Sequence, residues 1–199
     1  MKDRALIVFT RNPVKGKVKT RLAKTIGKEK AYEIYRELLH IAYVNTKSFP
    51  CDKYLYLSES LDENLFDSGF FQKLQEGIDL GERMLNALTE ILNTGYTKVV
   101  LVGADCPGLT RVILKDAFNK LGKNDIVLGP AEDGGYYLIG LKEPKEYLFR
   151  DMKWGHKKVL EETINRIKKN KHTHDLVAKL IDIDNVRDLA KVKGEIIRR

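Results

Sequence analysis

The sequence predicts an α/β protein built on a largely parallel sheet. Short apolar runs alternate with amphipathic helical segments along the chain, the order typical of βαβ units. The first run, residues 5–10 (ALIVFT), is apolar throughout, as in a central strand covered on both faces. The pair 125–130 (DIVLGP) and 136–141 (YYLIGL) flanks a short acidic turn with two glycines, which predicts one antiparallel strand.

The remaining elements follow from apolar periodicity and from turn residues between the periodic segments. Thr20 is a candidate N-cap of a first helix, with the cap open to a few residues on either side, and Thr110 is the predicted N-cap of a helix that ends at Leu121. Further helices are predicted over residues 28–46, 82–92, 154–169 and 186–192. Further strands are predicted over residues 54–57, 71–75, 99–103 and within 176–183.

Length and composition indicate one globular domain over residues 1–199, because a chain of this size buries an adequate core and 43% of its residues are hydrophobic. No apolar run is long enough to span a membrane. Two cysteines, Cys51 and Cys106, do not make a disulfide framework, and we therefore expect a reducing compartment, the cytoplasm.

The net charge of +8 is concentrated at one end of the chain. Residues 1–30 contain ten Lys or Arg and two Asp or Glu. A basic segment on a near-neutral body suits a ligand that carries phosphates. Nucleic acid is the weaker alternative, because the sequence has no interleaved arginine and aromatic residues, no helix-turn-helix pattern and no zinc-ligand spacing.

The basic segment follows the first predicted strand and reads RNPVKGKVKTRL over residues 11–22. A glycine-containing turn before a helix exposes backbone N–H groups, and Lys15, Lys17, Lys19 and Arg21 add positive side chains. The spacing of a Walker A loop is absent. The alternative is a solvated basic loop, since runs of charge usually lie on the surface.

Three acidic sites follow predicted strands. Asp105 ends the strand of residues 99–103, at the edge where open α/β sheets bind ligands. Carboxylates there ligate Mg²⁺ or Mn²⁺ together with phosphate oxygens, although a lone Asp before a proline turn is more often structural. The second site is the turn Glu132-Asp133-Gly134-Gly135. Its glycines either let the backbone come close to a ligand or simply form a hairpin turn. Asp182 and Asp184 would share one face of a strand, or Asp184 or Asn185 would cap the last helix.

Together these motifs resemble a known family. RNPVKGKVKTRL, DLGERM (79–84), VLVGADCPGLT, GPAEDGGYYLIGL and DIDNVRDL (182–189) resemble the bacterial glycosyltransferase-A-like proteins of the arsenosugar-biosynthesis type. These belong to the nucleotide-diphospho-sugar transferase superfamily, whose wider relatives include nucleotidylyltransferases for molybdenum cofactor and for phospholactate. The resemblance covers residues 5–192 and implies one Rossmann-like glycosyltransferase-A domain, with a mixed, mainly parallel sheet flanked by helices.

The resemblance also implies roles for particular residues. The nucleotide and its phosphates would be held by Arg11, Gly16, Lys19, Thr20 and Arg21, and by Gly81, Glu82 and Arg83 near the base. A divalent metal, Mg²⁺ or Mn²⁺, would be held by Asp105 and Asp184. Asp133, Gly134 and Gly135 would face the transferred group or the acceptor. Apart from the resemblance, an inverting reaction needs a catalytic base, for which Asp133 or Glu132 is the candidate. Tyr136 adjoins the glycines and is expected at the site, and Trp154 either lines an acceptor pocket or simply packs. Two departures from the family pattern are Gly103, which replaces the first acid of an Asp-x-Asp motif, and Asn185-Val186, where Thr-Pro is usual.

We therefore expect transfer of a glycosyl group from a nucleotide-diphosphate sugar to a small acceptor, assisted by a divalent metal. A nucleotidylyltransferase, which joins an NTP to a phosphorylated or carboxylated acceptor and releases pyrophosphate, would use the same loop and acids. A non-catalytic nucleotide-binding protein is the third possibility, because a fold alone does not establish turnover.

Overall fold

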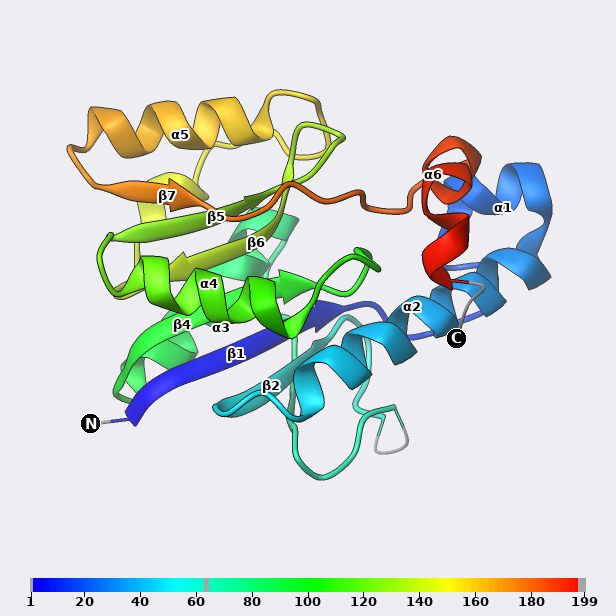
Figure 1. Ribbon diagram of the computed structural model, residues 1–199, viewed down its shortest axis with the longest axis horizontal. Helices are drawn as coiled ribbons and strands as arrows, with labels where there is room; N and C mark the ends of the chain where they lie inside the picture. The colour runs from blue at the N-terminus through cyan, green and yellow to red at the C-terminus, as the bar shows by residue number, and fades with distance from the viewer. Residues whose placement is uncertain (1, 63–64, 197–199) are drawn as a thin grey trace.

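In the part of the chain that the structure describes, seven strands form one sheet in the order β3-β2-β1-β4-β6-β5-β7. The computed structural model (Figure 1) describes residues 2–62 and 65–196, and residues 1, 63–64 and 197–199 of the predicted 1–199 domain lie outside the described residues. The strands are β1 (Lys2–Thr10), β2 (Asp52–Leu57), β3 (Phe71–Leu74), β4 (Tyr96–Gly103), β5 (Ile126–Pro130), β6 (Tyr136–Leu141) and β7 (His174–Leu176).

Only β6 runs against its neighbours among the described strands. It pairs antiparallel with both β4 and β5, whereas the other pairs are parallel. The predicted mixed, mainly parallel sheet is therefore confirmed. Because β6 is reversed, its first residue, Tyr136, lies at the same edge of the sheet as the last residues of β1, β4 and β5. Loops from both directions of the chain thus meet at one edge.

Two apolar layers cover the sheet. On one face, α2 and α4 pack against Leu6, Val8 and Val100, and on the other, α3 and α5 pack against Ile7, Leu101 and Ile139. No helix in the described ranges is both long and apolar enough to cross a membrane. The helices are α1 (Thr20–Ile26), α2 (Lys28–Lys47), α3 (Leu80–Asn93), α4 (Arg111–Leu121), the short 3-10 helix η1 (Glu146–Leu148), α5 (Val159–Lys169) and α6 (Val186–Ile196).

A third, smaller apolar cluster lies beyond the edge of the sheet, where Figure 1 shows α1 and α6 side by side next to the first half of α2. Its buried members include Leu22 of α1, Leu38 of α2 and Val192 of α6, together with Ile183 just before α6. This cluster brings the segment after β1 next to the segment that follows β7. Two parts of the chain that are about 160 residues apart therefore reach the same edge of the sheet.

Two predicted boundaries are wrong. The cap of α1, which was open to a few residues around Thr20, is Lys19. The helix predicted from Trp154 begins at Val159, because the backbone turns at Asp151 and Gly155, both of which have positive φ. The late strand ends at Leu176, since its partner β5 ends at Pro130, which has no N–H to extend the ladder. Beyond it, only the isolated bridge between Ala131 and Leu180 continues the parallel pairing within the described residues.

Gly134 joins the acidic turn before β6 to the start of α5. Its φ is +93°, and a Cβ atom there would lie 2.0 Å from the carbonyl oxygen of Lys157. The Gly134 carbonyl accepts a hydrogen bond of 2.9 Å from the backbone N–H of Leu160. Glycine is thus required both for the backbone angle and for the close approach.

Replacing Gly134 by alanine should therefore lower the free energy of unfolding by about 2–4 kcal/mol, from backbone strain plus the collision with Lys157. The matched control is Gly95→Ala, because Gly95 has a φ of +97° and open space around the missing Cβ. That control should lose only about 1 kcal/mol. Urea unfolding of both variants measures the difference, and equal losses would contradict the packing argument.

Candidate functional site

A cleft of about 780 Å³ opens at the carboxyl edge of the sheet. The loops after β1 and β4, the start of α3, the turn before β6, the loop before α5 and the segment after β7 line it. The predicted site residues among its lining are Arg11, Lys19, Thr20, Arg21, Arg83, Asp105, Asp133, Gly135, Tyr136, Trp154 and Asp184. Those outside its lining are Gly16, Gly81, Glu82, Glu132 and Gly134.

At the charged end of the cleft, Lys19 lies between two acids. Its Nζ atom is 3.0 Å from Oδ2 of Asp105 and 3.8 Å from Oδ1 of Asp184. Arg21 contacts the other oxygen of Asp184, with Nη1 to Oδ2 at 3.0 Å. The Lys19 side chain is only 4% exposed, whereas those of Arg21 and both acids are open to solvent. The structure therefore brings together four residues that the sequence assigned to phosphate and metal.

Two buried polar residues position the loop that carries Lys19. The hydroxyl of Tyr35, on α2, donates to the carbonyl of Arg11 and accepts from its N–H, both at 3.0 Å. Burial is the main reason that the pKa of Tyr35 lies above its usual value, so the hydroxyl stays neutral. The side chain of Asn12 donates to the carbonyl of Ser60 at 2.7 Å and accepts from the N–H of Glu59 at 2.8 Å. These bonds tie the ends of β1 and β2 together.

The segment after β7 delivers the late acids. The N–H of Ile183 donates to the carbonyl of Asp105 at 3.2 Å, so the two acidic loops are held side by side. The side-chain oxygen of Asn185 accepts from the N–H groups of Arg187 and Asp188, as an N-cap does. Asp182 and Asp184 lie outside a strand, contrary to one alternative from the sequence, yet both line the cleft.

Asp182 is a cleft residue to which the sequence assigned no role, although its alternation with Asp184 was the available signal. Its pKa is raised from 3.8 to about 6, first by burial and then by the charge of Asp133, with a smaller contribution from Asp184; Lys19 acts in the opposite direction. A carboxyl group that titrates near neutrality can accept or release a proton under ordinary conditions.

The two neighbouring acids of the turn before β6 have different surroundings. Oδ1 of Asp133 accepts a 2.7 Å bond from the N–H of Gly135, and its side chain lines the cleft. Glu132 forms an ion pair with Lys191 of α6, which lowers the pKa of the glutamate. Only Asp133 of this pair is placed to meet a ligand in the cleft.

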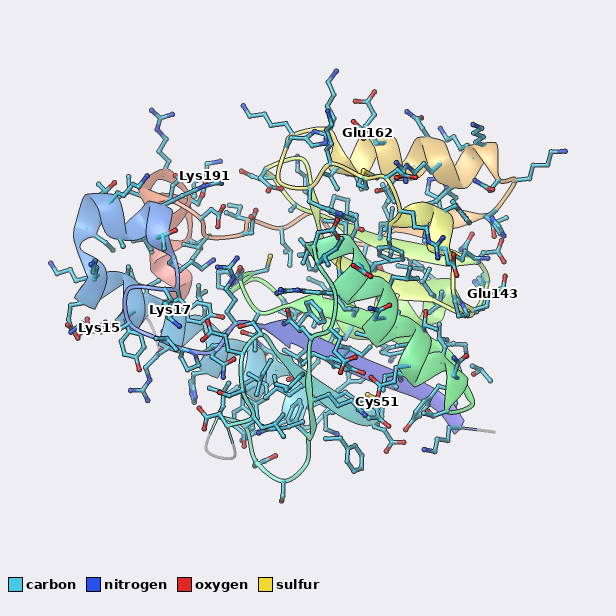
Figure 2. The ribbon with its side chains drawn as sticks, turned by 180° about the vertical axis from the view of Figure 1, so that it is seen from behind. Lys15, Lys17, Cys51, Glu143, Glu162 and Lys191 are labelled. Atoms are coloured by element: carbon cyan, nitrogen blue, oxygen red, sulfur yellow. The ribbon has the colours of Figure 1, made fainter. Side chains whose placement is uncertain are left out.

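Two of the loop lysines face away from the cleft. Lys15 forms an ion pair with Glu29, and Lys17 forms one with Glu59 at 3.0 Å. Figure 2 shows Lys15, Lys17 and Lys191 at the end of the molecule that α1 and α6 form. Lys15 and Lys17 are therefore surface residues of a solvated basic loop, the alternative to phosphate binding, whereas Lys19 and Arg21 line the cleft.

The opposite wall of the cleft comes from the first turn of α3. Asp79 caps this helix by accepting a 2.9 Å bond from the N–H of Glu82, and Nε of Arg83 donates to the carbonyl of Gly77 at 2.9 Å. Gly81 touches the indole of Trp154, because a Cβ there would lie 2.4 Å from Nε1. The regions that the sequence assigned to the base and to the acceptor are thus in contact.

Aromatic and aliphatic side chains line the interior of the cleft on that side. The rings of Tyr136 and Trp154 meet edge-on, with centroids 6.2 Å apart. Among the described residues, the buried Nε1 of Trp154 has no hydrogen-bond partner, and the buried hydroxyl of Tyr136 has none in normal geometry, although the Thr163 side chain is near it. Phe9, Met84, Leu101 and Ile139 line the same region. The cleft therefore has a charged end and an aromatic end.

Two other residues line the cleft, although the sequence assigned them no role in ligand binding. Gln75 donates from Nε2 to the carbonyls of Thr10 and Tyr56, at 2.7 and 3.0 Å, which fixes its side chain at the cleft lining. Cys106 is buried, and burial raises the pKa of its thiol well above the usual value. A thiol of that kind is a poor nucleophile, and Cys106 is a small residue of the buried core.

The charged end suits a hard divalent cation. Asp105 and Asp184 are oxygen donors that approach one ammonium group from two sides, and Mg²⁺ is commonly held by one or two carboxylates plus substrate phosphates. Within residues 2–62 and 65–196, no three His, Cys, Asp or Glu side chains are close enough to form a complete metal site. The donor set therefore fits an ion that shares its coordination with a ligand.

Comparisons with known proteins agree with this fold. The family model described as "Uncharacterized protein conserved in bacteria (DUF2064)" matches residues 43–156. No curated protein matches the chain. A protein of Desulfovibrio desulfuricans G20 with the provisional name of nucleotide-diphospho-sugar transferase is 26% identical, with a TM-score of 0.87 over 98% of this chain and 97% of its own.

Two more distant structures share the fold. The inositol-1-phosphate CTP transferase of T. maritima is 15% identical, with a TM-score of 0.64 over 98% of this chain and 96% of its own. The Rv0371C protein of Mycobacterium tuberculosis H37Rv, in complex with manganese, is 12% identical, with a TM-score of 0.52 over 96% and 98%. The predicted fold of the nucleotide-diphospho-sugar transferase type is confirmed.

The raised pKa of Asp182 predicts a pH-dependent stability difference. The pKa of Asp182 is about 6 in the folded protein and 3.8 in the unfolded chain. Ionisation of Asp182 therefore lowers the free energy of unfolding, increasingly from pH 3.8 to pH 6 and fully above pH 6. Asp182→Asn should thus match the wild type at pH 3.5 and exceed it by about 1–2 kcal/mol at pH 8, after allowance for solvent screening. Urea unfolding at both pH values tests this, and a difference independent of pH would refute it.

Proposed function

This chain belongs to the DUF2064 family of bacterial proteins, and we propose that it transfers a glycosyl group from a nucleotide-diphosphate sugar to a small acceptor. The placement of Lys19 and Arg21 against Asp105 and Asp184, at the ligand-binding edge of the sheet, is the observation that carries this proposal. All seven strands belong to one sheet, so we infer that residues 1–199 act as a single domain.

The basic side chains would hold the donor's diphosphate. Lys19 supplies a point charge and Arg21 a planar group that can bind two phosphate oxygens. Arg11 and Arg83 also line the cleft, and neither forms an ion pair with an acid in the described part of the chain. Their free positive charge would attract the anionic donor and stabilise charge that develops on the departing phosphate.

Asp105 and Asp184 would hold a divalent ion against that diphosphate. Such an ion, when bound, neutralises the phosphate oxygens and assists departure of the leaving group. The Rv0371C protein has manganese bound in its structure, and we therefore choose Mn²⁺ as the ion with which to test this chain. Gly103, where a second acid would complete an Asp-x-Asp motif, lines the cleft, and a Cβ atom there would make only an ordinary contact of 3.9 Å with the carbonyl oxygen of Tyr137.

Asp133 is the better of the two candidate bases. It would accept the proton of the acceptor hydroxyl as that oxygen bonds to the anomeric carbon, while the bond from carbon to the nucleotide diphosphate breaks. Its bond to the N–H of Gly135 orients the carboxylate. Gly135, Tyr136 and Trp154 would then contact the acceptor at the aromatic end of the cleft.

Nucleotidylyl transfer is the second candidate, because the T. maritima neighbour is a CTP transferase with the same fold. The same cations and acids would then act at the α-phosphate of an NTP, and pyrophosphate would be released. The narrower arsenosugar-type resemblance stays a prediction. A protein that binds nucleotides without turnover would bind the donor and release neither nucleoside diphosphate nor pyrophosphate.

The proposal predicts that nucleotide-diphosphate sugars with Mn²⁺ raise the melting temperature, with about 2.7 kcal/mol of stabilisation at 100 times Kd. Asp105→Ala should remove the part of this gain that depends on Mn²⁺. Asp116→Ala is the matched control, because Asp116 pairs with Lys120 on the surface of α4. Stabilisation by NTPs alone, with release of pyrophosphate, would favour the second candidate. No shift with either nucleotide-diphosphate sugars or NTPs would contradict both candidates.

The two acids before β6 provide an internal comparison. Asp133→Asn should lower kcat by about 10²–10⁴-fold, because a positioned general base is lost while the bond to Gly135 remains possible. Glu132→Gln should leave kcat close to the wild-type value, since Glu132 pairs with Lys191 outside the cleft lining. Steady-state kinetics with the donor identified by thermal shift measures both, and the reverse order of effects would show that the base is misassigned.

A further inference from the structure

We propose that Lys19 occupies, in the ligand-free protein, the place that the divalent ion takes in the loaded one, so that the cleft binds the ion as a complex with a diphosphate and excludes the free ion. This inference rests on the proposed function, because it assumes that Asp105 and Asp184 are the metal ligands. It adds a specific role for Lys19, which would exchange partners between two acids and a phosphate.

The position of the ammonium group is the first observation. It lies within 4 Å of both acids, the separation at which oppositely charged groups attract strongly in a partly buried site. The Lys19 side chain is nearly fully buried although its partners are not. A charged amine is buried in this way only when it is paired. Lys19 is therefore a built-in cation of the site, in contrast to the exposed lysines of the same loop.

The backbone holds Lys19 in that place. Its φ and ψ of 47° and 44° are left-handed, a conformation that a lysine adopts at a cost of about 1–2 kcal/mol. The residue is also the N-cap of α1, and its carbonyl accepts a 2.8 Å bond from the N–H of Ala23. The preceding Val18 is buried in the main core. The surrounding structure thus maintains a strained residue at the point where it meets the two acids.

Charge balance explains why a free ion would bind poorly. Lys19, Arg21, Asp105 and Asp184 form a set with no net charge. A free divalent ion would have to displace the ammonium group, which would then be left buried without a partner. Asp133 and Asp182 also line the cleft, but the ion pairs of Lys19 and Arg21 within the described residues are made with Asp105 and Asp184.

A diphosphate removes this obstacle. Its oxygens can accept the Lys19 ammonium while they complete the coordination of an ion that Asp105 and Asp184 hold. Each charged group then keeps a partner throughout the exchange. The ligand recognised by this end of the cleft would therefore be a metal–diphosphate complex.

The test measures Mn²⁺ binding by the spin resonance signal of the free ion, with Mn²⁺ alone and with pyrophosphate as the diphosphate probe. Lys19→Met should bind Mn²⁺ alone at least about ten-fold more tightly than the wild type, the effect of removing a competing charge worth about 1.4 kcal/mol. Lys17→Met is the matched control, because it removes the same charge from the same loop at a surface pair with Glu59. It should bind Mn²⁺ like the wild type.

A second pair of measurements makes the outcomes distinct. Adding Asp105→Asn to Lys19→Met should abolish the gain, which places the ion at the proposed acids. If Lys19→Met is unstable, Lys19→Gly replaces it, since glycine adopts the left-handed backbone without strain. Pyrophosphate should allow the wild type to bind Mn²⁺ in the cleft, and this binding should be lost in Asp105→Asn.

Two results would overturn the proposal in different ways. Equal binding of Mn²⁺ alone by the wild type and Lys19→Met, abolished in both by Asp105→Asn, would leave the metal site intact and refute the role of Lys19. Absence of Mn²⁺ binding in every variant, with or without pyrophosphate, would remove the metal site itself and with it the metal-assisted function.

Discussion

The ion pair between Lys19 and Asp105 joins parts of the chain that the fold brings together from a distance. Lys19 follows β1, Asp105 follows β4, and Asp184, the second acid near Lys19, precedes α6. The backbone bond between Ile183 and Asp105 holds the two acidic loops side by side. The charged end of the cleft depends on this contact, because without the lysine Arg21 would be the one cation of the described residues still paired with either acid.

The rest of the structure supports that contact and leaves the opposite end of the cleft apolar. Tyr35 and Asn12 fix the loop that precedes Lys19, and the small cluster of α1, α2 and α6 brings Asp184 to it. On the other side, Trp154 lies against Gly81 at the start of α3. A ligand with phosphates at one end and a less polar group at the other would match this division, as a nucleotide sugar and its acceptor do.

Much of the fold and the position of the site could be predicted from the sequence. Apolar runs and turn residues identify the sheet and its antiparallel strand, and acids at strand ends identify the cleft. The sequence could not show which side chains of a charged segment point into the cleft and which point to the surface. Lys17 and Lys19 are two residues apart in one basic run, yet a left-handed backbone at Lys19 sends only that lysine into the cleft. Likewise, only the packing of α6 shows that Glu132 pairs with Lys191 while Asp133 lines the cleft.

The most direct measurement is a crystal structure with Mn²⁺ and a nucleoside diphosphate, in which anomalous scattering locates the ion. Our account predicts an ion bound by Asp105 and Asp184, with the Lys19 ammonium moved from those acids to a phosphate oxygen. An ion located elsewhere, or phosphates bound outside the cleft while Lys19 still contacts Asp105, would contradict it.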